Sequence, residues 1–216
     1  MITDFSQFNS IINQFVAELR NVEIQSDRLR FRRNLERIGM LMAYEISKEL
    51  AYELYEVDTP LGTASVDLPV ETPVLGTIMR AGLPMHQGFL SIFDKSDNAF
   101  VSAYRKHHKD GTFEINIEYV SCPPLENRVL IIADPMLATG ASIVDTIQHL
   151  QEFGTPKQIH IATAIAAVDG INYVRRLLPD AKIWVGAIDE ELTAKSYIVP
   201  GLGDAGDLAY GEKLND

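Results

Sequence analysis

The chain has 216 residues, of which 30 are acidic and 19 basic, so the net charge is −11, and 46% of the residues are apolar. This length predicts a single domain, residues 1–216, that buries an ample core without stabilising cross-links such as disulfides. The lone Cys122 excludes an internal disulfide and predicts a reducing, cytoplasmic location. The absence of a signal-peptide pattern and of an apolar run of about 18 residues argues against a membrane partner, and the acidic balance argues against nucleic acid.

The first quarter of the chain predicts helices. We expect one helix over residues 5–20 and then a longer one, with Ser26 or Asp27 as its N-cap. Apolar residues at spacings of three or four predict its buried stripe: Phe31, Leu35, Ile38, Met42, Ile46, Leu50 and Leu54. Residues 1–57 would thus be a helical N-terminal arm. One face of the long helix carries basic side chains, which suit a solvated surface, a subunit contact or a phosphate effector: Arg28, Arg30, Arg32, Arg33 and Arg37.

Strand patterns follow the helical segment. Short apolar runs at residues 73–79 and 98–104 predict buried strands. Asp110-Gly111 then predicts a hairpin turn, and the alternation over residues 113–119 predicts a half-buried antiparallel strand with Tyr119 on its covered face. The hairpin would span residues 98–121.

The second half of the chain alternates between strand and helix patterns. Strands are expected at residues 129–132, 159–166 and 183–188, and helices at residues 142–153 and 171–178. This alternation predicts an α/β fold with a parallel sheet flanked by helices. The segment from residue 189 onward is rich in Gly, Pro and Asp and has no period, so we expect an irregular functional segment, although a surface tail without a task has the same composition.

The segment between residues 129 and 150 carries the strongest chemical signal. Asp134 ends a buried strand, small residues follow, and a helix begins near Ser142. Ligands of open α/β sheets bind at this edge, and a helix N-terminus offers free N–H groups to an anion. No lysine lies between Arg128 and Lys157, which excludes a Walker loop and favours a phosphate monoester. An ordinary strand–helix turn with an N-cap explains this pattern equally well.

Residues 132–142, which read IADPMLATGAS, closely resemble the phosphoribosyl-pyrophosphate (PRPP) motif of the uracil phosphoribosyltransferases, a family of type I phosphoribosyltransferases. Further segments resemble the same family: residues 39–45, the pyrophosphate loop at 78–85, the pair Tyr104-Arg105, and the hood segments 187–190 and 197–207. The chain departs from the family pattern at Ala141, where glycine is usual, in residues 106–111, and in its first thirty residues.

The resemblance implies a type I phosphoribosyltransferase-like sheet with a mobile hairpin at residues 98–121 and a base-binding hood at residues 189–216. It implies transfer of the phosphoribosyl group of PRPP to uracil, which gives UMP and pyrophosphate by electrostatic stabilisation of an oxocarbenium-like transition state. Mg²⁺ would be carried by PRPP, so no dedicated metal ligand is expected in the protein. The resemblance also implies a homodimer or larger homo-oligomer and leaves a GTP effector open.

The resemblance assigns a role to individual residues of this chain. Catalytic roles would fall to Arg105, Asp134 and Asp204. The residues expected to bind PRPP are Arg80, Arg105, Asp134, Pro135, Met136, Leu137, Ala138, Thr139, Gly140, Ala141, Ser142 and Asp204. Uracil would be bound, chiefly through backbone groups, by Ile198, Gly203, Asp204 and Ala205. Two alternatives remain: a regulator that binds UMP or PRPP without turnover, and a type I transferase for another base such as a purine.

Overall fold

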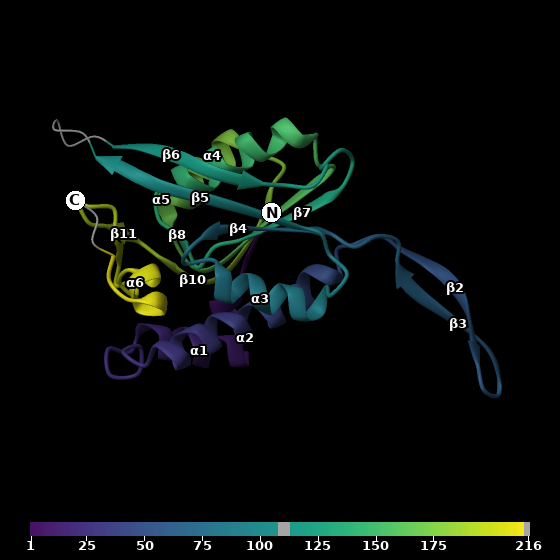
Figure 1. The fold of residues 1–216 in the computed structure, drawn as a ribbon. Helices are drawn as coiled ribbons and strands as arrows, with labels where there is room; N and C mark the ends of the chain where they lie inside the picture. The colour runs from purple at the N-terminus through teal and green to yellow at the C-terminus, as the bar shows by residue number, and fades with distance from the viewer. Residues whose placement is uncertain (108–112, 214–216) are drawn as a thin grey trace.

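The computed structural model describes residues 1–107 and 113–213, and gives only the backbone for residues 103–107 and 113–117. The described residues form a mainly parallel sheet between two layers of helices (Figure 1). In spatial order its strands are β1 (Ile2–Asp4), β10 (Lys182–Asp189), β9 (Gln158–Ala167), β7 (Val129–Ala133), β4 (Val74–Met79), β5 (Asn98–His107) and β6 (Phe113–Ser121). The β5–β6 pair is antiparallel and the others are parallel, which confirms the predicted fold class.

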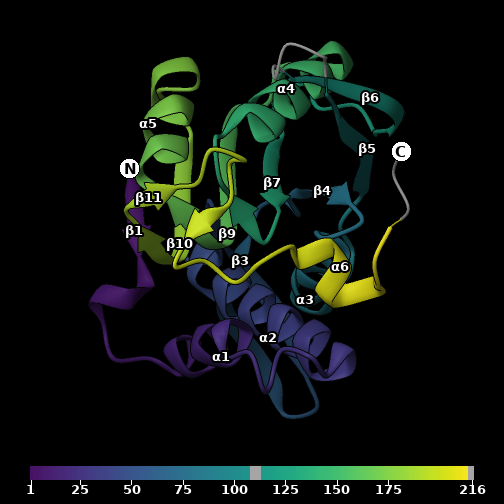
Figure 2. The same ribbon diagram turned by 90° about the vertical axis from the view of Figure 1, so that its left-hand side faces the viewer.

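Helices cover both faces of the sheet, as Figures 1 and 2 show. One face is covered by α4 (Ala141–Leu150), which continues into a 3₁₀ turn at Gln151–Phe153, and by α5 (Val168–Leu177). The other face is covered by a 3₁₀ turn at Phe5–Gln7, α1 (Ile11–Arg20), α2 (Arg28–Ser47) and α3 (Leu83–Ile92).

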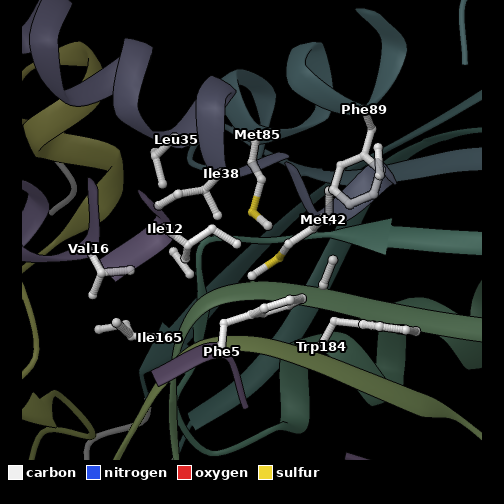
Figure 3. Close-up of a cluster of buried hydrophobic side chains, with 14 of the residues drawn as sticks. Phe5, Ile12, Val16, Leu35, Ile38, Met42, Met85, Phe89, Ile165 and Trp184 are labelled. Atoms are coloured by element: carbon white, nitrogen blue, oxygen red, sulfur yellow. The ribbon is translucent and has the colours of Figure 1, made fainter. Parts of the chain in front are cut away.

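The second layer of helices is packed through a large apolar cluster (Figure 3). The side chains of Leu35, Ile38 and Met42 from α2 meet those of Met85 and Phe89 from α3. Because these side chains are fully buried, the predicted apolar stripe of the long helix is confirmed as far as residue 46.

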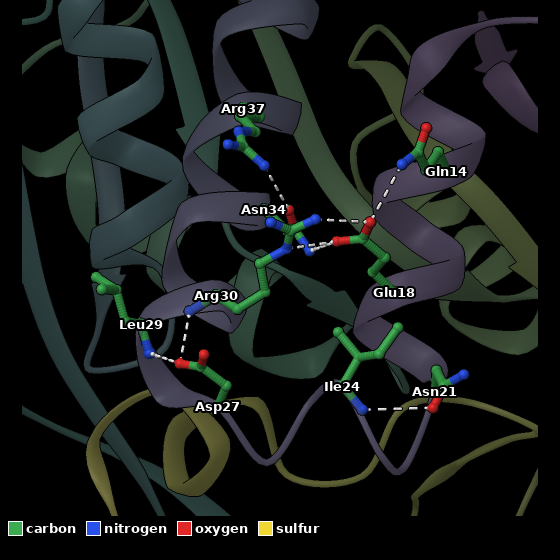
Figure 4. A network of polar contacts seen from close by, with 9 residues as sticks. All are labelled: Gln14, Glu18, Asn21, Ile24, Asp27, Leu29, Arg30, Asn34 and Arg37. Atoms are coloured by element: carbon green, nitrogen blue, oxygen red, sulfur yellow. Dashed lines mark hydrogen bonds and ion pairs between the residues drawn. The ribbon is translucent and has the colours of Figure 1, made fainter.

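A polar network joins α1 to α2 (Figure 4). The Glu18 carboxylate accepts hydrogen bonds from Arg30 Nε at 2.8 Å, Arg30 Nη2 at 2.9 Å and Asn34 Nδ2 at 2.7 Å. These hydrogen bonds, the one from Arg30 first, lower the pKa of Glu18 to about 2. At the start of α2, the Asp27 side chain accepts from the N–H groups of Leu29 and Arg30, so Asp27 is the N-cap.

The core of the sheet contains an aromatic pair. Trp184 is buried, and its indole N–H donates to Nδ1 of His160 at 3.0 Å. Burial lowers the pKa of His160 to about 4, so this imidazole is neutral at pH 7. Trp184 therefore belongs to the core of the protein.

The prediction of one helix that reaches Leu54 is wrong. Helix α2 ends at Ser47, and Leu54 lies in strand β2 (Tyr52–Thr59), which pairs with β3 (Gly62–Pro69). Residues 1–57 are thus not wholly helical. The spacing of Leu54 fits a helix by coincidence, whereas the aromatic and β-branched residues around it favour a strand. We call β2, β3 and their turn the β-arm; it projects away from the body of the protein (Figure 1).

The hairpin of residues 98–121 is antiparallel, as predicted, although its Asp110-Gly111 turn lies outside the described residues. Tyr119 is 54% exposed and not covered as expected, because β6 is the edge strand of the sheet. The expected irregular tail is also corrected, because it holds three short elements: β11 (Glu191–Leu192), β12 (Ile198–Val199) and α6 (Ala205–Tyr210). Elements this short show no periodicity in a sequence. Among the described helices, none is long and apolar enough to cross a membrane.

Candidate active site

The predicted phosphate loop lies at the carboxyl end of the central strand β7. Asp134 follows this strand directly, and its backbone N–H donates to the carbonyl of Ala162 in β9 at 3.1 Å. Its carboxylate Oδ1 accepts from the backbone N–H of Met136 at 3.2 Å, which closes a local turn. The acid is thereby fixed at the edge of the sheet where substrates of α/β enzymes bind.

The middle of the loop is part of the sheet. Met136 and Leu137 form the two-residue strand β8, which pairs with Ile165 and Ala166 of β9. The side chain of Leu137 is buried and that of Met136 packs against the core, so side-chain packing and backbone pairing both fix this part of the loop.

The loop ends in a helix N-terminus that is suited to an anion. Gly140 has a φ of +84°, and α4 begins at the next residue, Ala141. The backbone N–H of Ala141 donates to Thr139 Oγ1 at 3.4 Å, a long contact that a phosphate oxygen can replace, and the N–H groups of the first turn of α4 suit phosphate oxygens. Ala141 is helical, so a methyl group is compatible with its backbone.

A glycine that sequence reasoning missed supports this loop from behind. A Cβ atom on Gly170, in the first turn of α5, would lie 2.8 Å from the carbonyl oxygen of Leu137 and still closer to that of Ala138. A Cβ atom on Gly140 would in turn lie 2.8 Å from the carbonyl oxygen of Gly170. The loop and α5 therefore touch backbone to backbone, and the sequence signals this contact only by a glycine beside a predicted helix.

The predicted pyrophosphate loop lies next to Asp134. It follows β4, and its Met79–Arg80 peptide bond is cis. A Cβ atom on Gly82 would lie 2.8 Å from the carbonyl oxygen of Ala133, the residue before Asp134. Thr77 also donates its hydroxyl to that carbonyl at 3.1 Å. The structure thus brings the Arg80 loop and the Asp134 loop together, as the sequence predicts.

The hood contacts this pair of loops through Arg80. The guanidinium Nη2 donates to Asp207 of α6 at 3.0 Å and to the carbonyl of Gly211 at 3.4 Å. Asp204 caps α6 by accepting from the N–H of Asp207 at 3.0 Å, and its other oxygen lies 3.5 Å from Lys213 Nζ. Sequence reasoning singled out Asp204 and missed Asp207, although the second acid of the same GDAGD segment is visible in the sequence.

The predicted base-binding residues form the turn of the hood. Ile198 and Ala205 are buried, so they face a ligand through their backbone. Gly201 and Gly203 have φ values of +58° and +96°, which favour glycine. The conformation of this turn therefore depends on glycine at these two positions.

Helix α1 holds the hood in place. Arg20 at its end donates to both carboxylate oxygens of Asp189, at 2.7 and 2.8 Å, and to the carbonyl of Gly201 at 3.1 Å. The backbone N–H of Gly201 donates to the same carboxylate at 3.0 Å. Sequence reasoning missed Arg20 because the first thirty residues showed no resemblance to the family.

Two further residues, Arg105 and Cys122, have a chemistry that depends on their surroundings. Arg105 lies in β5 opposite Ile115, and its side chain is outside the described part of the chain. Burial raises the pKa of the Cys122 thiol to about 11, so this thiol is protonated at pH 7.

No group of three or more metal-ligating side chains occurs among the side chains that the structure describes, those of residues 1–102 and 118–213. The protein offers separate carboxylates, Asp134, Asp204 and Asp207, at the site. Such a site fits a Mg²⁺ ion that arrives on the phosphate groups of its substrate.

The parallel sheet and the loop–helix site at its edge place the protein among the type I phosphoribosyltransferases. The sequence model of one family, described as Uracil phosphoribosyltransferase, matches residues 8–212, and the chain belongs to this family. Because the match begins at residue 8, α1 and Arg20 are part of the family domain, which corrects the expectation that the first thirty residues do not match.

Individual relatives support the same assignment. The uracil phosphoribosyltransferase of Porphyromonas gingivalis is 55% identical over 207 residues, which cover 95% of this chain and 96% of that protein. That of Methanococcus vannielii is 39% identical over 202 residues, which cover 91% of this chain and 84% of that protein. The solved structure of the AQ2163 protein from Aquifex aeolicus matches with a TM-score of 0.88 and 29% identity, and all of both chains is covered.

Proposed function

We propose that the chain transfers the phosphoribosyl group of PRPP to uracil and releases UMP and pyrophosphate. The observation that carries the proposal is the contact between two loops, the Asp134 loop with its helix N-terminus and the Arg80 loop packed against it. Family membership and the named relatives support the choice of uracil as the acceptor.

In this reaction a bond forms between N1 of uracil and C1′ of the ribose, while the bond from C1′ to pyrophosphate breaks and N1 loses its proton. Positive charge builds on the ribose as the leaving group departs. The N-terminus of α4 holds the 5′-phosphate, and Asp134 accepts hydrogen bonds from the ribose hydroxyls. Arg80 and Arg105 offset the charge on the leaving pyrophosphate, and Mg²⁺ is bound as part of the PRPP substrate. The rate acceleration therefore comes from the positioning of the two substrates and from electrostatic stabilisation of the transition state.

Uracil selection is proposed to depend on the backbone of the hood turn. The backbone groups of Ile198 and of residues 203–205 read the polar edge of uracil, while Asp204 lies beside the base and reaches PRPP. Cytosine presents the opposite donor and acceptor pattern at one position of that edge. It would leave buried polar groups unpaired, so a large preference for uracil is expected.

The test is pyrophosphate release from PRPP, Mg²⁺ and uracil, compared with cytosine and hypoxanthine as acceptors. We expect release with uracil alone. The variant Arg105→Ala should lower kcat more than it weakens UMP binding, whereas Arg128→Ala, far from the site and paired with Asp97, should behave as the native chain. UMP binding without any turnover would instead identify a nucleotide-binding regulator, and turnover of hypoxanthine would identify a purine transferase.

Three further proposals accompany this function. The protein is proposed to be a homodimer or larger homo-oligomer, and to work in the cytoplasm, where a lone thiol stays reduced. The arginine-rich face of α2 is proposed as the site where GTP would act, which the same assay tests when it is run with and without GTP. An unchanged rate at saturating GTP would remove GTP as an effector.

A further inference from the structure

The guanidinium of Arg80 is held on one side by the hood. Its Nη2 donates to Asp207 Oδ1 at 3.0 Å and to the carbonyl oxygen of Gly211 at 3.4 Å, and its Nη1 lies 3.4 Å from that same oxygen. These contacts engage at most three of the five N–H donors of an arginine side chain. Donors on Nε and Nη1 therefore remain for an anion that approaches from the other side.

The first turn of α6 packs directly on the Arg80 loop. A Cβ atom on Gly206 would lie 3.7 Å from Arg80 Nη2, 4.0 Å from the Cβ atom of Ala81 and 3.2 Å from Asp204 Oδ1. Asp204 Oδ1 also accepts from the backbone N–H of Asp207 at 3.0 Å. The turn of α6 whose Asp204 is proposed to lie beside the base thus also carries the carboxylate that contacts Arg80.

The ion pair between Arg80 and Asp207 contributes more to orientation than to stability. The side chain of Arg80 is 40% exposed and that of Asp207 is 28% exposed. Ion pairs that are exposed to this degree stabilise a fold only weakly, because water screens their charges. An arginine side chain that is not held has many rotamers, and the loss of this freedom opposes the binding of a ligand. A guanidinium that the protein already holds avoids most of this loss.

The negative charge of Asp207 is offset by its surroundings. Besides Arg80, three basic side chains lie around α6 and the residues that follow it: Arg28, Arg32 and Lys213. The Arg28 guanidinium is beside Gly211, and Arg32 Nη1 donates to the carbonyl of Ala209 at 2.6 Å. A carboxylate among these cations can orient Arg80 without making the region repel an anion.

We propose that Asp207 is a positioning residue for the leaving group, which holds Arg80 so that its remaining donors meet the oxygens of pyrophosphate. The inference rests on the proposed function, in which Arg80 binds the pyrophosphate of PRPP. Asp207 touches neither substrate and acts through Arg80. Because Asp207 and Asp204 share one turn of α6, the same turn links the base side of the site to the leaving-group side.

The experiment measures, by calorimetry with Mg²⁺, the binding of two probes: inorganic pyrophosphate, and ribose 5-phosphate, which has the 5′-phosphate but no pyrophosphate. Asp207→Ala should weaken pyrophosphate binding by about threefold to tenfold, the effect of leaving one long side chain free, and leave ribose 5-phosphate binding unchanged. Asp207→Asn should lie in between, because its oxygen still accepts from Arg80. Asp97→Ala is the control, since Asp97 pairs with Arg128 at the opposite edge of the sheet and should bind both probes as the native chain does.

A double variant tests whether Asp207 acts through Arg80. Arg80→Ala should itself weaken pyrophosphate binding, and adding Asp207→Ala should cause no further loss. Additive losses, tighter pyrophosphate binding in Asp207→Ala, or an equal loss for both probes would overturn the inference. So would native pyrophosphate binding by Asp207→Ala in a protein whose native chain converts uracil to UMP, which leaves the proposed function intact. A native chain that neither binds nor releases pyrophosphate would overturn the proposed function and this inference together.

Discussion

Replacing Arg20 should uncouple the hood from α1 and weaken uracil binding selectively. Arg20→Met removes three hydrogen bonds, two of them to the carboxylate of Asp189, which is only 7% exposed. Loss of one partner of a buried ion pair costs about 3–5 kcal/mol, because it leaves the other charge uncompensated. The Arg20 side chain is 22% exposed, so water replaces part of the lost contact. We therefore expect a cost just below this range, about 2–3 kcal/mol of unfolding free energy.

The functional effect should appear in the KM for uracil. Gly201, which Arg20 and Asp189 hold from both its carbonyl and its N–H, follows the Ile198 backbone that is proposed to read the base. An increase of about tenfold in the uracil KM corresponds to about 1.4 kcal/mol of the lost free energy. The KM for PRPP should stay nearly constant, because the Asp134 loop is held by β9 and α5.

The assay combines urea unfolding with steady-state kinetics for each substrate in turn. Arg30→Met is the matched control, since Arg30 makes a similar two-pronged contact with Glu18 between α1 and α2 but does not touch the hood (Figure 4). It should lower stability without a change in the uracil KM. Adding Asp189→Asn to Arg20→Met should restore part of the stability, because the buried charge disappears. Equal changes in both KM values, or none in that for uracil, would refute the reasoning.

Three other predictions follow from single residues. Gly170→Ala should push the loop carbonyl of Ala138 away and raise the KM for PRPP by at least about tenfold, a loss of about 1.4 kcal/mol, while the uracil KM stays near native; an unchanged PRPP KM would contradict the close contact. His160 has a pKa of about 4 in the folded state against 6.5 ordinarily, so its contribution is complete above pH 6.5 and is lost as the pH falls toward 4, because only the unfolded chain gains the proton. This loss amounts to about 3 kcal/mol of unfolding free energy. Urea unfolding between pH 7.5 and 4 should show that the free energy of unfolding falls less with pH in His160→Gln, whose side-chain oxygen still accepts from Trp184. An equal fall in both chains would exclude His160 as the cause. Cys122, with a pKa of about 11, should react with thiol reagents at pH 8 far more slowly than a free cysteine, and a rate equal to that of free cysteine would show that the thiol is not buried as described.

The catalytic half of the fold could be predicted from the sequence because its signals are local and long enough to read. The strand before Asp134, the small residues of the loop and the apolar period of α4 all point to the same structure. The strand–helix alternation that follows fixes a parallel sheet, and the carboxyl ends of parallel strands meet at one edge. Asp134 and the Arg80 loop therefore come together as expected.

The missed features depend on contacts between distant segments. Arg20 meets Asp189 across 169 positions of the sequence, and no local pattern marks either residue as a partner. Gly170 is required because it contacts the carbonyl oxygens of Leu137 and Ala138 in the phosphate loop. The residues next to Gly170 in the sequence give no sign of this contact. Most of β2, the first strand of the β-arm, was predicted as helix because a single leucine, Leu54, continued the helical spacing beyond Ser47.

The strand β8 has a consequence for the entropy of substrate binding. Its two residues lie inside the phosphate loop yet are paired with β9, so this part of the loop is ordered before any ligand arrives. Fixing a residue costs about 1–2 kcal/mol in backbone entropy, and here folding has already met that cost. The amides of β8 should accordingly be protected from hydrogen exchange in the free protein, and PRPP should add little to their protection. The loop is thus a preorganised binding site for the 5′-phosphate. Its affinity for the phosphate depends on a geometry that is fixed during folding.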